Sequence, residues 1–91
     1  MVEQFQWTNP HTLLVIGVAR RAGVTQDWNI QGQAPQFLTW RGWSKDTLKP
    51  GDRISLKIYP LKNGTRGGTC LRVALADGHV MFMLENPPDT R

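Results

Sequence analysis

The stretch "QFQWTNPHTLLVIGV", residues 4–18, decides the fold, because it joins an aromatic segment to the most apolar run in the chain. Residues 2–7 alternate in character, so that Phe5 and Trp7 share one side while Val2 lies on the other. This alternation has the period of a β-strand. We therefore expect the chain to begin with a strand that has one aromatic face.

A proline divides this strand from the next. Asn9-Pro10 ends the first strand, since proline has no N–H to donate and holds the preceding residue in extended backbone. Residues 12–20 then resume as a second strand. Their run at 13–16 is apolar on both faces, which is typical of a strand in the middle of a sheet.

Turn residues divide the rest of the chain into further short elements. Arg21-Ala22-Gly23 is expected to be a hairpin turn, and the glycine-rich segment 61–68 a mobile loop. Lys49-Pro50-Gly51-Asp52 is expected to be a type II turn, with glycine at its third position. Alternating apolar residues bounded by these and other turns predict four more strands, at residues 24–31, 53–59, 69–76 and 79–84. In the strand at 53–59, the inward residues are expected to be Ile54, Leu56 and Ile58.

One short helix is predicted between the third and fourth strands. Residues 35–41 begin with Pro35, which suits a first helical turn, and precede Gly42, which suits the left-handed position after a helix. A helix of about two turns is not stable alone. We therefore expect it to pack against the sheet through its apolar side chains, Phe37, Leu38 and Trp40.

These elements predict a fold of the all-β class, made mainly of strands. We expect a small OB-like antiparallel β-barrel of five to six strands, with the short helix between strands 3 and 4. Closure into a barrel would remove the exposed edges that a small sheet otherwise presents. An open sheet with the helix across one face is the alternative architecture.

Length and composition limit the chain to one folded domain. The 91 residues suit a single core, which we place at residues 1–86, followed by a polar C-terminal tail at 87–91. Hydrophobic residues make up 40% of the chain and charged residues 20%, so the composition is that of a globular protein rather than a disordered one. Cys70 is the single cysteine, which excludes an intrachain disulfide.

Four motifs in fixed order carry a family resemblance: "FQWTNPH", "RGWSKDTLKPGD", "YPLKNGTRGG" and "VALADG". Together they resemble an uncharacterised bacterial family of small, mostly exported domains of unknown function. Members of that family usually have a secretion signal ahead of the tryptophan-containing strand. The resemblance implies a periplasmic or secreted protein, whereas the chain as given opens without a signal peptide, which leaves a cytoplasmic location open.

Catalysis has little support in the sequence. His11 and His79 have no recognisable motif around them, and Cys70 lies on a predicted strand with no signature of a lowered thiol pKa. No phosphate-binding glycine motif or CxxC motif is present. We therefore expect a protein that is not an enzyme and that has no cofactor.

A binding or interaction module is the leading functional hypothesis. The segments "WTNPH" and "RGW" would meet near one rim of a closed barrel, where polar groups would surround tryptophan walls. The candidate ligand-binding residues are Trp7, Asn9, His11, Arg41 and Trp43. The alternative is structural: Trp7 and Trp43 fill the core, and "WTNPH" is the bend between two strands.

Two other kinds of site are weaker candidates. The net charge of +4 and the OB-like pattern suggest binding of single-stranded nucleic acid, through Arg53, Lys57, Tyr59, Lys62, Arg66 and Arg72. Alternation also places three potential copper ligands on one face of the last strand, with Cys70 or His11 to complete the set: His79, Met81 and Met83.

Partners are expected to be other polypeptides. The N-terminal strand, residues 2–7, would leave an open edge that another protein chain or a second copy in a homodimer could occupy by strand addition. The longest apolar run is too short to cross a bilayer, so we expect no membrane insertion.

Overall fold

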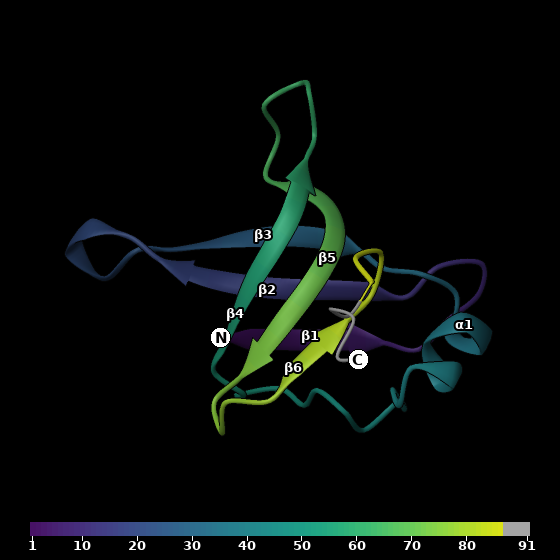
Figure 1. The fold of residues 1–91 in the computed structure, drawn as a ribbon. Helices are drawn as coiled ribbons and strands as arrows, with labels where there is room; N and C mark the ends of the chain where they lie inside the picture. The colour runs from purple at the N-terminus through teal and green to yellow at the C-terminus, as the bar shows by residue number, and fades with distance from the viewer. Residues whose placement is uncertain (87–91) are drawn as a thin grey trace.

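A computed structural model describes residues 1–86, and the expected tail at 87–91 lies outside the described residues. A 3-10 turn, η1 (Arg21–Gly23), joins the second and third strands, and the short helix α1 (Pro35–Trp40) lies between the third and fourth (Figure 1). No helix of the described residues is long and apolar enough to span a membrane. The strands are β1 (Val2–Gln6), β2 (Leu13–Ala19), β3 (Thr25–Gln31), β4 (Ile54–Pro60), β5 (Gly67–Leu75) and β6 (Val80–Phe82).

All strands of the described residues belong to one sheet, in the order β1-β2-β3-β5-β4, with β6 added to β5. The mainly β class and the helix between the third and fourth strands are therefore confirmed. The sheet is not wholly antiparallel, because β3 and β5 run parallel where residues 29–31 pair with 67–69. The connection between them, which contains α1 and β4, is long enough for the crossover that a parallel pair requires.

The expected barrel closure is not found. The end strands β1 and β4 do not pair with each other among the described residues, so the sheet stays open. Two backbone hydrogen bonds link one end of β1 to the turn before β4: Val2 donates to Asp52 O, and Gly51 donates to Val2 O, each at 2.8 Å. The turn has the predicted geometry, since Gly51 has φ +94°. In the part of the chain that the structure describes, these two bonds are what joins the edges.

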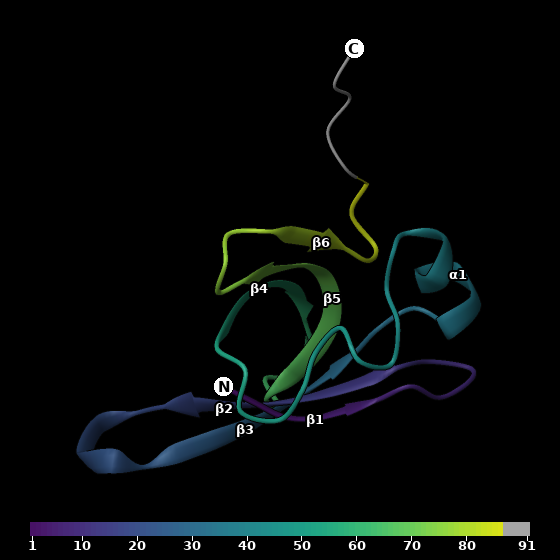
Figure 2. The same cartoon turned by 90° about the horizontal axis from the view of Figure 1, so that it is seen from below.

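The open sheet curls into two layers. Figures 1 and 2 show β1, β2 and β3 in one layer, with β4, β5 and β6 crossing over them in the second. The core lies between the layers, and its buried apolar side chains come from both: Leu14, Ile16 and Ile30 from the first, Cys70 and Val73 from the second. The segment between α1 and β4, together with α1 itself, contributes further buried side chains: Leu38, Trp43 and Leu48.

A bulge changes which residues of β1 face the core. The register with β2 shifts between Val2 and Gln4, so one extra residue is accommodated in β1. As a result Val2 is buried on the same side as Phe5 and Trp7, which pack against the core. The prediction that Val2 lies on the opposite face was wrong, because a one-residue insertion reverses the alternation.

The chain after α1 turns back in a Schellman motif. Trp43 donates its backbone N–H to Leu38 O at 2.9 Å, and Gly42 donates to Thr39 O at 3.2 Å. Gly42 has φ +89°, the left-handed conformation predicted for it. This reversal brings Trp43 back over Leu38, the pair of positions that form the hydrophobic contact of the motif. Both side chains are buried.

Only one of the three side chains expected to anchor α1 does so. Leu38 is buried together with Pro35, whereas Phe37 is 61% exposed and Trp40 is 91% exposed. The prediction was wrong for Phe37 and Trp40 because residues three apart share one face of a helix. Pro35 and Leu38 occupy the inner face, and the two aromatic residues occupy the outer one.

The strand boundaries otherwise lie close to the predicted ones, with one informative exception. Gly67 and Gly68, expected in a mobile loop, are buried residues of β5, which begins there. At this point β5 lies between β3 and β4: Gly68 pairs with Ile30 on one side and with Pro60 on the other. Residues without Cβ atoms allow three strands to approach closely.

Candidate binding groove

The five side chains predicted to form a ligand rim do not meet at one pocket. Phe5 lies between two of them, with its ring centroid 5.9 Å from that of Trp7 and 6.0 Å from that of Trp43. Trp43 is only 2% exposed, and its indole Nε1 donates to Phe82 O at 2.8 Å. Trp7 is half-buried against the core. Both tryptophans therefore contribute to packing.

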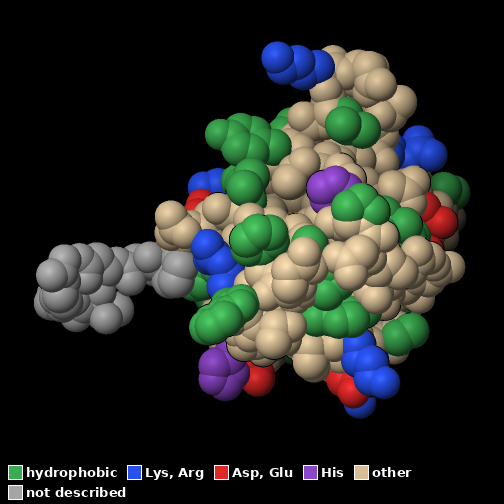
Figure 3. Space-filling view, turned by 90° about the vertical axis from the view of Figure 1, so that its right-hand side faces the viewer, with side chains coloured by type: hydrophobic (Ala, Val, Ile, Leu, Met, Phe, Trp, Pro, Cys, Tyr) green, Lys and Arg blue, Asp and Glu red, His purple; other side chains and the backbone are tan. Residues whose placement is uncertain are grey.

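The polar members of the predicted rim lie apart. The Asn9-Pro10 peptide is cis and forms the bend after β1, and His11 lies beside a separate hollow that Phe37 also lines. Arg41 instead donates to Glu85 O at 3.0 Å and to Asn86 Oδ1 at 2.7 Å, so it holds the segment that follows β6. Figure 3 shows the face that includes α1, where exposed hydrophobic side chains form separate small patches among polar atoms.

The predicted copper ligands point to different environments. Met83 is fully buried and Met81 packs against the core, whereas the side chain of His79 is 78% exposed in the turn before β6. His79 Nδ1 lies 2.9 Å from Asp77 Oδ2, and this hydrogen bond raises the pKa of the imidazole. Among residues 1–86, no three His, Cys, Asp or Glu side chains form a metal-binding group.

The predicted nucleic-acid residues fall into two groups. Lys57 and Tyr59 are on the outer, exposed face of β4, Arg53 is exposed directly before this strand, and Arg72 of β5 is opposite Lys57. Glu85 lies between the two cations, with carboxylate oxygens 2.6 Å from Arg72 Nη1 and 3.4 Å from Lys57 Nζ. The hydrogen bond from Arg72 lowers the pKa of Glu85, which remains charged and partly neutralises this patch.

The second group of predicted nucleic-acid residues lies in the loop between β4 and β5. Lys62 is exposed there. Arg66 donates its Nε to Asp27 O at 3.2 Å, and Arg66 O accepts from the backbone N–H of Asn29. Arg66 therefore holds the loop against β3.

Cys70 is fully buried on β5, and burial raises the pKa of its thiol to about 12. The thiolate is the reactive form, so we expect Cys70 to be inert toward 5,5′-dithiobis(2-nitrobenzoate) in the folded protein at pH 8. In concentrated urea the same thiol should react at once. The measurement is absorbance during labelling under both conditions, and equally fast labelling of the folded protein would show that Cys70 is accessible.

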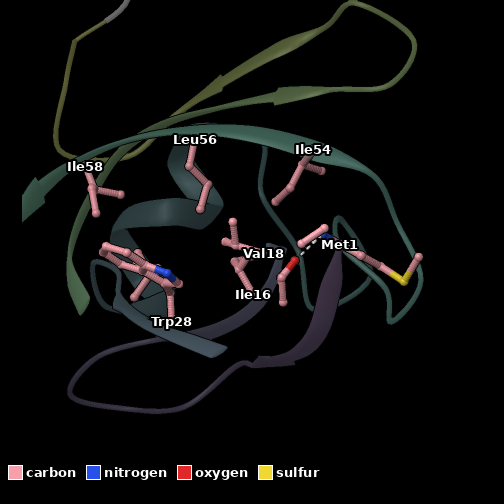
Figure 4. Close-up of a pocket in the computed structure, with 10 residues that line it drawn as sticks. Met1, Ile16, Val18, Trp28, Ile54, Leu56 and Ile58 are labelled. Atoms are coloured by element: carbon pink, nitrogen blue, oxygen red, sulfur yellow. Dashed lines mark hydrogen bonds between the residues drawn. The ribbon is translucent and has the colours of Figure 1, made fainter. Parts of the chain in front are cut away.

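An apolar groove lies between the layers, on the side away from α1, and sequence reasoning missed it. It has a volume of about 370 Å³, within the range of small-ligand pockets. Figure 4 shows its two walls, with the side chains of β4 pointing toward those of β2 and β3. The apolar side chains that line it are Met1, Ile16, Val18, Ala19, Trp28, Ile30, Ile54, Leu56 and Ile58.

The groove exists because the sheet stays open. Its β4 wall consists of the three inward residues Ile54, Leu56 and Ile58, whose alternation the sequence predicted correctly. They are only half-buried, because no strand of residues 1–86 follows β4 in the sheet to cover them. The sequence signal for this site was therefore present as an apolar face. What the sequence did not show was that the face remains partly open.

Charge in the groove lining is confined to the amino group of Met1. No side chain in its lining carries a charge. The one polar contact drawn in Figure 4 is the amine of Met1, which donates to Gly17 O at 2.9 Å. The lining therefore favours apolar groups, which gain from leaving water, and provides no side chain that acts as an acid, a base or a nucleophile.

Comparison with known proteins gives one match. A family model described as "Family of unknown function (DUF6152)" matches residues 1–72. No curated protein and no solved structure matches the chain. All residues that line the groove fall within the matched segment, whereas β6 lies outside it.

Proposed function

The chain belongs to this family of unknown function, and we propose that it is a non-catalytic binding module whose site is the groove between β4 and the β2–β3 hairpin. The observation that carries the proposal is an open cavity of about 370 Å³ whose lining side chains are all apolar, in a domain of this size. Apolar side chains that gather at one open site, rather than lie scattered singly over the surface, mark a place where an apolar partner binds. Here Leu56 of β4 and Trp28 of β3 point toward the space between the two layers, and both stay half-buried.

Two features of the groove support binding rather than chemistry. The lining offers apolar contact area from three different strands, which fixes its shape, and it offers no reactive side chain. Cys70, the single thiol, is fully buried, and its raised pKa keeps it in the unreactive form. An apolar ligand or an apolar part of a partner is the occupant that such a lining selects.

The proposal includes the cellular setting. The resemblance to mostly exported bacterial domains supports an accessory module in the periplasm or outside the cell, and rests on sequence alone. A module of this kind would act by protein–protein or protein–ligand interaction.

The test uses N-phenyl-1-naphthylamine, a neutral apolar dye whose fluorescence rises when it leaves water. We expect saturable binding of one dye per chain, weakened at least tenfold in Leu56→Lys, because a lysine there brings a charge into the apolar lining. Ser55→Lys is the matched control: it places the same side chain on the exposed outer face of β4 and should leave the affinity within twofold.

Folding must be separated from binding in this test. Val18→Lys provides a second groove variant, because Val18 lines the groove yet is 38% exposed and tolerates a longer side chain. Circular dichroism checks that each variant folds. Unchanged dye affinity in folded Leu56→Lys and Val18→Lys would place the dye elsewhere and overturn the proposal, as would a wild-type chain that does not bind the dye.

A further inference from the structure

We propose that the groove binds an extended polypeptide segment, which adds to the free edge of β4 as a new strand. Its alternate apolar side chains enter the groove, and its alternate outward side chains are acidic. This inference rests on the proposed function and specifies the partner class. It also moves the expected site of strand addition from the edge of β1 to the edge of β4.

The first argument is the free edge itself. β4 pairs with β5 from Ile54 to Pro60, and among the described residues it has no strand on its other side. Alternate residues of an antiparallel strand direct their backbone N–H and C=O groups to opposite edges. The free edge of β4 therefore presents a row of donors and acceptors beside the groove, until Pro60, which lacks an N–H, ends it.

The second argument is the gap between the two end strands. β1 meets the turn before β4 through the backbone of Val2, which bonds to Gly51 and Asp52. From there β4 runs across the layer that contains β1, and the two strands separate (Figures 1 and 2). The backbone N–H and C=O of Val2 are already hydrogen-bonded to the turn. In contrast, no described strand pairs with the free edge of β4 beyond residue 53.

The third argument is the pattern of side chains on β4. Ile54, Leu56 and Ile58 point into the groove (Figure 4). A strand beside β4 has the same pleat, so its own alternate side chains point to the same side and would cover these three residues. A strand that covers these three side chains therefore needs apolar residues at every second position. A small apolar molecule covers the lining equally well but leaves the backbone groups of the edge unpaired.

The fourth argument is charge on the outer face. Arg53 and Lys57 are exposed on the side of β4 that faces away from the groove, and the side chain of Lys57 is 53% exposed. Glu85 is 3.4 Å from Lys57 but binds Arg72 more closely, at 2.6 Å, so Lys57 can turn to a new partner. Directly opposed charges on neighbouring strands attract when unlike and repel when alike. The outward residues of the partner are therefore acidic.

The same charges argue against a second copy of this chain as the occupant. Antiparallel pairing of two β4 strands with their apolar faces inward would bring Lys57 and Arg53 of one copy beside those of the other. The net charge of +4 adds a general repulsion between copies. A segment of another protein in which acidic and apolar residues alternate would meet neither of these repulsions.

The experiment uses a fluorescein-labelled heptapeptide of alternating glutamate and valine, titrated with the full chain and followed by fluorescence anisotropy. We expect saturable binding that weakens at least tenfold when lysine replaces the glutamates. N-methylation of one set of alternate residues should abolish binding, and methylation of the other set should leave it within about threefold. A strand added to an edge pairs only one set of its N–H groups, so this asymmetry identifies strand addition.

The outcomes separate this inference from the proposed function. If the dye binds the groove but the peptide does not, or if both methylated peptides bind equally, strand addition is overturned and the groove remains a ligand site. If neither dye nor peptide binds, both proposals fail. If sedimentation shows a dimer that folded Leu56→Lys disrupts, a second copy is the occupant, which also overturns the inference.

Discussion

Trp43→Ala should lower the free energy of unfolding by about 3–5 kcal/mol, the range measured for loss of a large buried aromatic side chain. Trp43 is 2% exposed, contacts Phe5 and lies at the end of the Schellman motif that closes α1. Its removal leaves a cavity at the end of the core where α1 and the following turn fill the space between the layers. Urea denaturation followed by circular dichroism gives the change.

Two other substitutions make this test specific. Trp40→Ala removes the same side chain three residues earlier, where it is 91% exposed, and should change stability by less than about 0.5 kcal/mol. Trp43→Phe keeps an aromatic ring but removes the indole N–H, which leaves Phe82 O without that donor, at a cost of about 1–3 kcal/mol. Similar effects of Trp40→Ala and Trp43→Ala would contradict the placement of both tryptophans.

The contrast between these two tryptophans shows how far the sequence can predict the fold. The helix and the left-handed Gly42 follow from local residue preferences, and both were predicted. Which face of the helix turns inward depends on the layers that it meets, and these come from distant segments. A helix of six residues contributes too few apolar positions for its period to indicate that face.

The candidate site was less predictable than the strands for a related reason. The alternation of β4 identified Ile54, Leu56 and Ile58 as inward residues, and this was confirmed. Whether the sheet closes over them depends on the pairing of β1 with β4, which no local pattern encodes. The expected barrel would have buried this face, and the open sheet leaves it as the wall of a groove.

Close approach of three strands was equally invisible from local sequence. Gly67-Gly68 is typical of a loop, and residues of a loop would tolerate substitution. In the structure a Cβ on Gly67 would lie 2.8 Å from Asn29 O, which belongs to β3. A Cβ on Gly68 would overlap the carbonyl oxygen of Tyr59, which belongs to β4. These two glycines are thus a requirement of the tertiary structure.

Gly68→Ala should therefore lower the free energy of unfolding by about 3 kcal/mol, near the upper end of the usual cost of overpacking. The added methyl group would also come within 2.9 Å of the carbonyl carbon of Tyr59 and 3.1 Å of Pro60 Cα. These are backbone atoms, so no side chain can rotate away to make room. Relief requires β4 and β5 to move apart at the Pro60 end of their ladder.

Ser55→Ala is the control for this substitution, since it lies on the same ladder but on the exposed face and should change stability by less than about 0.5 kcal/mol. Urea denaturation of both variants is the measurement. A Gly68→Ala variant as stable as the wild type would mean that β5 does not lie tightly between β3 and β4. Because β5 is the one described strand that pairs with β4, that result would also remove the basis for placing Ile58 in the wall of the groove.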